Sequence, residues 1–115
     1  MNSTLVLLGA AVVAGAYFVF LRRGGDVSGE AARKLVAGGA RLLDVRTRGE
    51  FASGHLPGAV NIPLQELGAR LKDAGAKDQS IVVYCLSGQR SAQAKHMLTA
   101  DGFSAVHDLG AMNRW

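Results

Sequence analysis

The sequence predicts an α/β domain built on a parallel, doubly wound β-sheet that is flanked by helices. Two observations along residues 28–115 predict this class. Short apolar runs rich in β-branched residues, typical of buried strands, alternate with segments whose apolar residues recur at helical spacing. Turns that contain glycine separate these segments. Strands that alternate with helices pair in parallel, because each helix carries the chain back to begin the next strand.

The first two predicted elements lie at the start of this domain. Ser28 precedes a segment with helical spacing and is expected to be the N-cap of a helix over residues 30–36. Gly38-Gly39 ends that helix, because glycine readily adopts the conformation that closes a helix. The run 41–45 is then a short strand that ends in a polar turn.

The next segment begins with a capping box. Thr47 and Glu50 stand three residues apart, the spacing at which each side chain caps the backbone N–H of the other, so we expect a short helix that turns Phe51 inward. The remaining predicted elements are, in order, a short strand at 59–62, a helix over 64–74, a buried strand over 80–84, a helix reaching about residue 100, a strand over 103–108 and a closing turn or short helix over 109–115.

An apolar segment without charged side chains, residues 2–21, precedes the domain. Its length fits one membrane-spanning helix, which needs roughly 20 apolar residues. A cleaved signal peptide fits less well, because no Lys or Arg precedes the run and its A-x-A-like site, residues 14–16, lies inside it. We therefore expect a single-pass transmembrane helix.

Two positive charges follow this segment directly, at Arg22 and Arg23, and none precedes it. The positive-inside rule then places the α/β domain in the cytoplasm. The predicted organisation is a membrane anchor with its basic flank at 1–23, a linker at 24–27 and the domain at 28–115.

Composition excludes several functions. The net charge of +4 is spread along the chain without interleaved aromatic and basic residues, so nucleic-acid binding is not expected. A single cysteine allows no internal disulfide and no paired-cysteine zinc site. His96 and His107 lack the spacing of metal ligands. We expect no metal and no cofactor.

The single cysteine, Cys85, stands at the end of the buried strand 80–84 and shortly before a helix. Ligands of parallel sheets bind at the carboxyl ends of the strands. Backbone N–H groups and the positive end of a helix dipole meet at such a junction and favour an anion, and Arg90 adds a positive charge. We predict that Cys85 is a thiolate nucleophile rather than a small buried hydrophobe.

A second polar turn, formed by Asp44, Val45 and Arg46, ends the strand 41–45 and is expected at the same edge of the sheet. We interpret Asp44 and Arg46 as residues that shape this turn rather than react. We likewise interpret His55, in the turn-rich connector 54–58, as structural.

The residues from about Asp26 onward resemble a single-domain rhodanese, a member of a sulfurtransferase family. The motifs that carry the resemblance occur in the family's order. They are Leu43-Asp44-Val45-Arg46 with Glu50-Phe51, the run Gly54-His55-Leu56-Pro57-Gly58-Ala59-Val60-Asn61-Ile62-Pro63, the loop Cys85-Leu86-Ser87-Gly88-Gln89-Arg90-Ser91, and Gly102-Phe103 with Leu109-Gly110-Ala111-Met112-Asn113-Arg114-Trp115.

The resemblance implies transfer of sulfane sulfur from a donor such as thiosulfate to a thiol or cyanide acceptor, through a persulfide on Cys85. It implies that backbone amides of the loop cradle the terminal sulfur, with Ser91 as a nearby helix cap. Leu86 departs from the family, which often has a basic residue there, and Ala111 replaces a common second glycine. The residues expected to form this cradle for the terminal sulfur are Leu86, Ser87, Gly88, Gln89 and Arg90.

Two other functions stay open. Cysteine phosphatases and arsenate reductases of the related fold place five residues between cysteine and arginine, whereas four separate Cys85 from Arg90, and Tyr84 stands where those enzymes have histidine. A membrane-tethered binding module with a weak site is the other alternative. For the enzyme, the chain has no second cysteine to resolve a persulfide, so the acceptor must be a separate thiol or protein.

Overall fold

The structure is a computed structural model that describes residues 25–115. Within that range no helix has both the length and the apolar character needed to cross a bilayer. The membrane helix expected at residues 2–21 lies outside the described residues.

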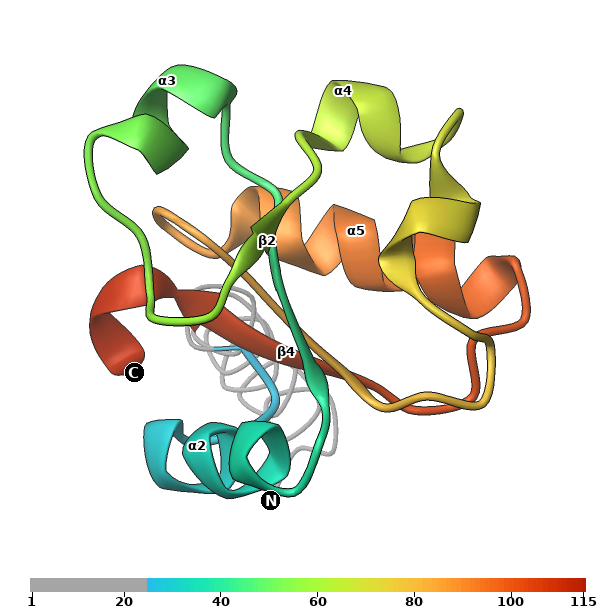
Figure 1. Ribbon diagram of the computed structural model, residues 1–115, viewed down its shortest axis with the longest axis horizontal. Coiled ribbons are helices and arrows are strands. Elements are labelled where there is room, and N and C mark those ends of the chain that lie inside the picture. Colours follow the sequence, from blue (N-terminus) through green and yellow to red (C-terminus); the bar gives the residue numbers. More distant parts are fainter. Residues whose placement is uncertain (1–24) are drawn as a thin grey trace, which may run out of the picture.

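The described residues form a four-stranded parallel sheet in the order β2-β1-β3-β4 (Figure 1). All five residues of the central strand β3 are buried, as expected for a parallel sheet that is covered on both faces. The strands are β1 (Arg41–Asp44), β2 (Val60–Asn61), β3 (Ile81–Cys85) and β4 (Val106–Ala111).

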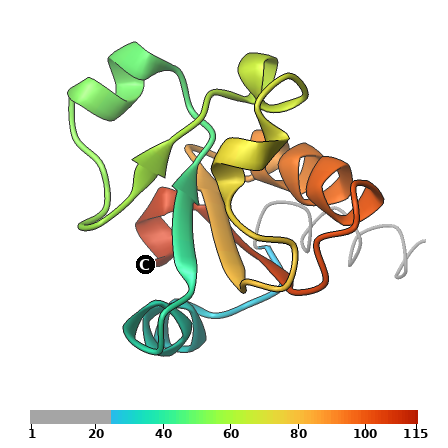
Figure 2. The same ribbon diagram turned by 45° about the vertical axis from the view of Figure 1, so that its right-hand side comes forward.

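Helices cover both faces of the sheet, and Figure 2 shows them on opposite sides. One face carries α2 (Gly29–Ala37) and the short 3₁₀ helix η2 (Met112–Arg114). The other carries α4 (Leu64–Leu67), the 3₁₀ helix η1 (Leu71–Ala74) and α5 (Gln89–Ala100). The short helix α3 (Arg48–Ala52) stands beyond the carboxyl end of β1 (Figure 1). The predicted α/β class with a parallel sheet and flanking helices is confirmed.

Alternating residues of β3 divide the hydrophobic core into two clusters. Val83 and Cys85 pack with residues of α4 and α5, whereas Val82 and Tyr84 pack with residues of α2. Successive side chains of a strand point to opposite faces. The last two residues of β3 therefore reach the same sheet edge on opposite faces.

The predicted caps of the first two helices are confirmed. The Ser28 hydroxyl accepts the Ala31 N–H at 3.1 Å. Thr47 and Glu50 form the complete capping box, with the Glu50 N–H on Thr47 Oγ1 at 3.1 Å and the Thr47 N–H on Glu50 Oε1 at 3.0 Å.

Three expectations were wrong in detail. The helix predicted over 64–74 is two short helices, because Gly68 ends α4 and η1 begins only at Leu71. Phe51 does not enter the core but stacks half-buried on the His55 ring, with centroids 3.7 Å apart. The last strand begins and ends later than predicted, at Val106–Ala111.

Residues 25–27, which fall in the expected linker, lie against β4. Gly25 has a φ of +70°, and a side chain there would collide with the carbonyl of Asp108. The N–H groups of Asp26 and Val27 donate to that same carbonyl, at 2.7 and 3.2 Å. Residues 25–27 are thereby fixed to the edge strand of the sheet.

Candidate active site

Cys85 is the last residue of β3, and three loop residues separate it from α5. Gly88 is the N-cap of α5 with a φ of +102°, a conformation that glycine adopts without strain. The Cys85 side chain is fully buried, and its Sγ accepts the Gly88 N–H at 3.0 Å. Among the described residues, Gly88 is the only loop residue whose backbone N–H donates a hydrogen bond to the sulfur.

Ser91 lies beside the sulfur, inside the first turn of α5 rather than at its N-cap. Its Oγ is 3.5 Å from Cys85 Sγ, with the thiol as donor, and it donates to the Gly88 carbonyl at 3.1 Å. Ser91 is fully buried. The expectation that Ser91 caps α5 is therefore wrong, because Gly88 occupies that position and has no capping side chain.

The remaining loop residues differ in exposure. Leu86 is 57% exposed, the most exposed large hydrophobic side chain of the described residues. Ser87 and Gln89 are also exposed, whereas Arg90 is partly buried. The mouth of the loop is thus formed by an apolar side chain next to two neutral polar ones.

Arg90 pairs with Glu50 of α3. Its Nη1 and Nη2 donate to Glu50 Oε1 and Oε2 at 2.6 and 3.0 Å. These hydrogen bonds, with the Thr47 N–H second, lower the pKa of Glu50 to about 2. The sequence indicated both residues, Glu50 as a capping residue within a family motif and Arg90 as a positive charge of the cradle, but it did not indicate that they pair. The cation of the loop is in fact balanced by a carboxylate.

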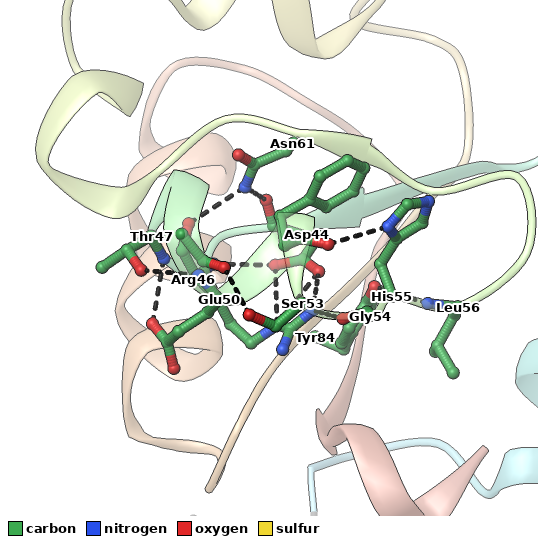
Figure 3. Close-up of polar contacts among 12 residues, drawn as sticks. Asp44, Arg46, Thr47, Glu50, Ser53, Gly54, His55, Leu56, Asn61 and Tyr84 are labelled. Carbon is green, nitrogen blue, oxygen red and sulfur yellow. Dashed lines mark hydrogen bonds and ion pairs between the residues drawn. The ribbon is translucent and has the colours of Figure 1, made fainter.

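Asp44 and Arg46 form a buried ion pair at the end of β1 (Figure 3). Arg46 Nε lies 3.1 and 3.0 Å from the two oxygens of Asp44, and its Nη2 lies 2.7 Å from Oδ2. The same Nη2 donates to the Gly54 carbonyl at 2.7 Å. The hydrogen bonds that Arg46 donates to Asp44 are the main reason that the pKa of Arg46 is raised. The pair ties the turn after β1 to the connector before β2.

Tyr84 completes this cluster from β3. Its ring lies beneath the Arg46 guanidinium, 5.8 Å from centroid to Cζ, and its hydroxyl accepts the Leu56 N–H at 3.1 Å. Burial is the largest cause of a raised pKa of Tyr84, so it stays neutral. Asn61 donates to the carbonyls of Asp44 and Arg46. We call Asp44, Arg46, Asn61 and Tyr84 the Asp44 cluster.

Asp108 on β4 is a buried carboxylate that the sequence interpretation did not single out; its exposure is 5%. Its Oδ1 accepts the Gly110 N–H at 2.8 Å. Burial is the largest cause of its raised pKa. An aspartate at the end of the predicted strand, two residues before Gly110, was the available signal.

A metal site is not formed among the described residues, where no group of three or more His, Cys, Asp or Glu side chains comes together. The geometry instead defines an α/β domain that holds one cysteine sulfur at the carboxyl edge of its sheet, in a loop that opens a helix. Such a loop suits a sulfur nucleophile and an anionic ligand.

The chain belongs to the rhodanese family: the family pattern described as Rhodanese-like domain matches residues 28–115. It is 36% identical over 95 residues to the human thiosulfate:glutathione sulfurtransferase, covering 70% of this chain and 83% of that protein. It is 37% identical over 71 residues to thiosulfate sulfurtransferase PspE of Escherichia coli strain K12, covering 61% of this chain and 68% of the relative.

Solved structures agree in fold. The human single-domain sulfurtransferase TSTD1 superimposes with a TM-score of 0.72 at 33% identity, covering 78% of this chain and 93% of that one. A rhodanese with anions from E. coli superimposes with a TM-score of 0.63 at 34% identity, covering 66% of this chain and 91% of that one.

Proposed function

We propose that the protein is a sulfurtransferase that passes sulfane sulfur from a donor such as thiosulfate to a thiol or cyanide acceptor through a persulfide on Cys85. The observation that carries this is the buried Cys85 sulfur at the end of β3, held by the Gly88 N–H and next to the Ser91 hydroxyl. Relatives named as thiosulfate sulfurtransferases support the donor class.

The reaction has two displacements. The Cys85 thiolate attacks the outer sulfur of thiosulfate, a new S–S bond forms on Sγ, and sulfite leaves with the electron pair of the old bond. The acceptor then attacks the outer sulfur and releases the Cys85 thiolate. The Gly88 N–H already donates to Sγ and stabilises its negative charge.

Access to the sulfur requires a movement of the loop. Cys85 has no exposed surface, whereas Leu86 and Ser87 next to it are exposed. A donor reaches Sγ only when these loop residues move aside. The acceptor is a separate molecule, because Cys85 is the only cysteine of the chain.

Mass spectrometry of the intact protein tests the proposal. After incubation with thiosulfate and removal of small molecules, the protein should gain the mass of one sulfur atom, located on Cys85 by peptide mapping. Added cyanide should restore the original mass and release an equal amount of thiocyanate. A protein that gains no sulfur from thiosulfate or from an organic persulfide would overturn the assignment.

A binding module is the second candidate, favoured by one observation: the reactive side chain is buried while its neighbour Leu86 is 57% exposed and apolar. An unreactive Cys85 in the mass experiment would support this candidate. Hydrolysis of an aryl phosphate, tested in parallel, would support a phosphatase instead.

We further propose that residues 2–21 anchor the domain as a single-pass membrane protein with the domain in the cytoplasm, supported by the uncharged segment and the following Arg22-Arg23. The full chain should stay in the membrane pellet after alkaline carbonate extraction, and protease should reach the domain only from the cytoplasmic side. Release of the intact full-length chain into the soluble fraction would contradict the anchor.

A further inference from the structure

The loop that follows Cys85 has one polar contact with a distant part of the chain. The Gly88 N–H donates to Cys85 Sγ at 3.0 Å, a bond within the loop itself. Among the described residues, the hydrogen bonds that join residues 86–90 to a segment outside the loop and α5 run from the Arg90 guanidinium to the Glu50 carboxylate, at 2.6 and 3.0 Å. A single ion pair therefore ties the loop to α3.

The helix α3, which carries Glu50, is itself held loosely. None of its five residues is buried. Phe51 stacks half-buried on His55, and the side chain of Arg48, which pairs with Glu66, is 72% exposed. An element with few buried apolar contacts separates from its neighbours at low cost. We infer that α3 can move away from α5 without disturbing the core.

The ion pair lies where solvent reaches it, whereas the sulfur does not. Cys85 has no exposed surface, so a reagent reaches Sγ only when the loop residues move. The side chains of Arg90 and Glu50 are 28% and 29% exposed. A dissolved anion can therefore meet the guanidinium before it meets the sulfur.

Resting on the proposed function, we propose that the Glu50–Arg90 ion pair is a latch that keeps the Cys85 loop closed, and that an anionic sulfur donor opens it by replacing Glu50 on Arg90. The guanidinium presents two N–H groups to the carboxylate, and the oxygens of a tetrahedral oxyanion such as thiosulfate can accept the same two bonds. The released Glu50 carboxylate becomes hydrated. Glu50 acts through Arg90 and is a positioning residue.

The latch is weak enough to be exchanged. Solvent screens a partly exposed ion pair, so that it changes an equilibrium by about fivefold at most. The fully enclosed pair of Asp44 and Arg46 would hold its segment far more strongly. The Glu50–Arg90 latch therefore lowers the fraction of molecules with an open loop rather than blocking the site.

The rate of Cys85 alkylation by iodoacetamide, measured against pH without any sulfur donor, tests the latch. The rate rises as the thiolate forms and then levels off, and the level reached at high pH reports access to the sulfur alone. In Glu50→Gln this level should rise about three- to fivefold, because the charge is lost while the capping box remains. A shifted midpoint with an unchanged level would overturn the proposal, since Glu50 would then affect only the pKa of the thiol.

Two further variants define the pair. Arg90→Gln removes the other half of the latch and should raise the level equally, and the double variant should rise no further than either single variant. Gains that add in the double variant would mean that the two residues act separately, against the latch. Glu30→Gln is the matched control, because it removes the carboxylate of an exposed pair with Lys34 on α2. It should leave the level unchanged.

The exchange step is tested on the wild-type protein with sulfate, a doubly negative oxyanion that donates no sulfur. At the same ionic strength, sulfate should raise the high-pH alkylation rate about two- to fivefold more than chloride, and this difference should vanish in Arg90→Gln. Equal rates in sulfate and chloride would overturn the exchange. These results are independent of the mass test: a protein that gains no sulfur would refute the proposed function, whereas a level unaffected by Glu50→Gln would refute the latch.

Discussion

The Asp44 cluster and the Cys85 loop lie at the same edge of the sheet, and consecutive residues of β3, Tyr84 and Cys85, belong to one each. In the cluster, ionic groups are bound to one another: Arg46 reaches both oxygens of Asp44 and a carbonyl. In the loop, the sulfur has one amide donor and one neighbouring hydroxyl. The ionic groups of the cluster are satisfied by one another, whereas the buried sulfur of the loop is held by few hydrogen bonds.

The Asp44 cluster therefore contributes to stability and the Cys85 loop to reactivity, although the two lie within a few residues of each other. A buried charge without its partner is strongly destabilising, so the cluster fixes the turn after β1 firmly. A thiol exchanges its weak hydrogen bonds at little cost. The fold can therefore hold the loop on a rigid base without fixing the sulfur itself.

Cys85→Ser should have the largest effect on activity. A serine hydroxyl fits the site but is a poor nucleophile toward sulfur, so sulfur transfer from thiosulfate to cyanide should fall to background. The fold should remain, with a loss of about 1–3 kcal/mol for burying a hydroxyl. Thiocyanate formation and circular dichroism measure the two effects. Retained activity in this variant would remove Cys85 from the mechanism.

Asp44→Ala should have the largest effect on stability. It leaves the Arg46 guanidinium buried without its carboxylate, and we expect a loss of about 3–5 kcal/mol in urea unfolding. The double variant Asp44→Leu with Arg46→Met should recover part of that loss, because it removes both charges. A single-variant loss below about 1 kcal/mol would show that the cluster is not the rigid base of the site.

Local patterns in the sequence predicted the elements and the nucleophile, because their rules act over a few residues. The Ser28 cap, the capping box of Thr47 and Glu50 and the position of Cys85 at a strand end are of this kind. The spacing of apolar residues in 64–74 failed, because it is the same in one helix as in two short ones separated at Gly68.

Contacts between distant residues were beyond such rules. Glu50 and Arg90 are 40 positions apart, so nothing local indicated that the capping carboxylate also binds the loop cation. The placement of Asp108 likewise depends on a bulge in β4 that shifts the strand register. The sequence therefore predicted Cys85 as the nucleophile and Arg90 as a neighbouring charge, but not the carboxylate that pairs with Arg90.

Glu50→Gln should free the Arg90 guanidinium from its ion pair. Glutamine preserves the capping box but not the charge, so Arg90 becomes available to an anionic donor. The KM for thiosulfate should fall up to about fivefold, the equivalent of about 1 kcal/mol for a partly exposed pair, and the gain should shrink at high salt. Glu66→Gln is the matched control, since Glu66 pairs with Arg48 and Arg70. An unchanged KM would mean that Arg90 serves only to tie α3 to the loop.

Leu86→Arg should have the smallest effect and act on the mouth of the loop alone. The side chain is 57% exposed, so a charge there is solvated and should change stability by no more than about 0.5 kcal/mol. Its attraction for the doubly negative thiosulfate should lower KM about two- to fivefold, with kcat unchanged. Leu86→Gln controls for loss of the apolar surface, and a neutral organic persulfide controls for donor charge. An equal gain with the neutral donor would show that Leu86 limits access to the sulfur rather than selecting donors by charge.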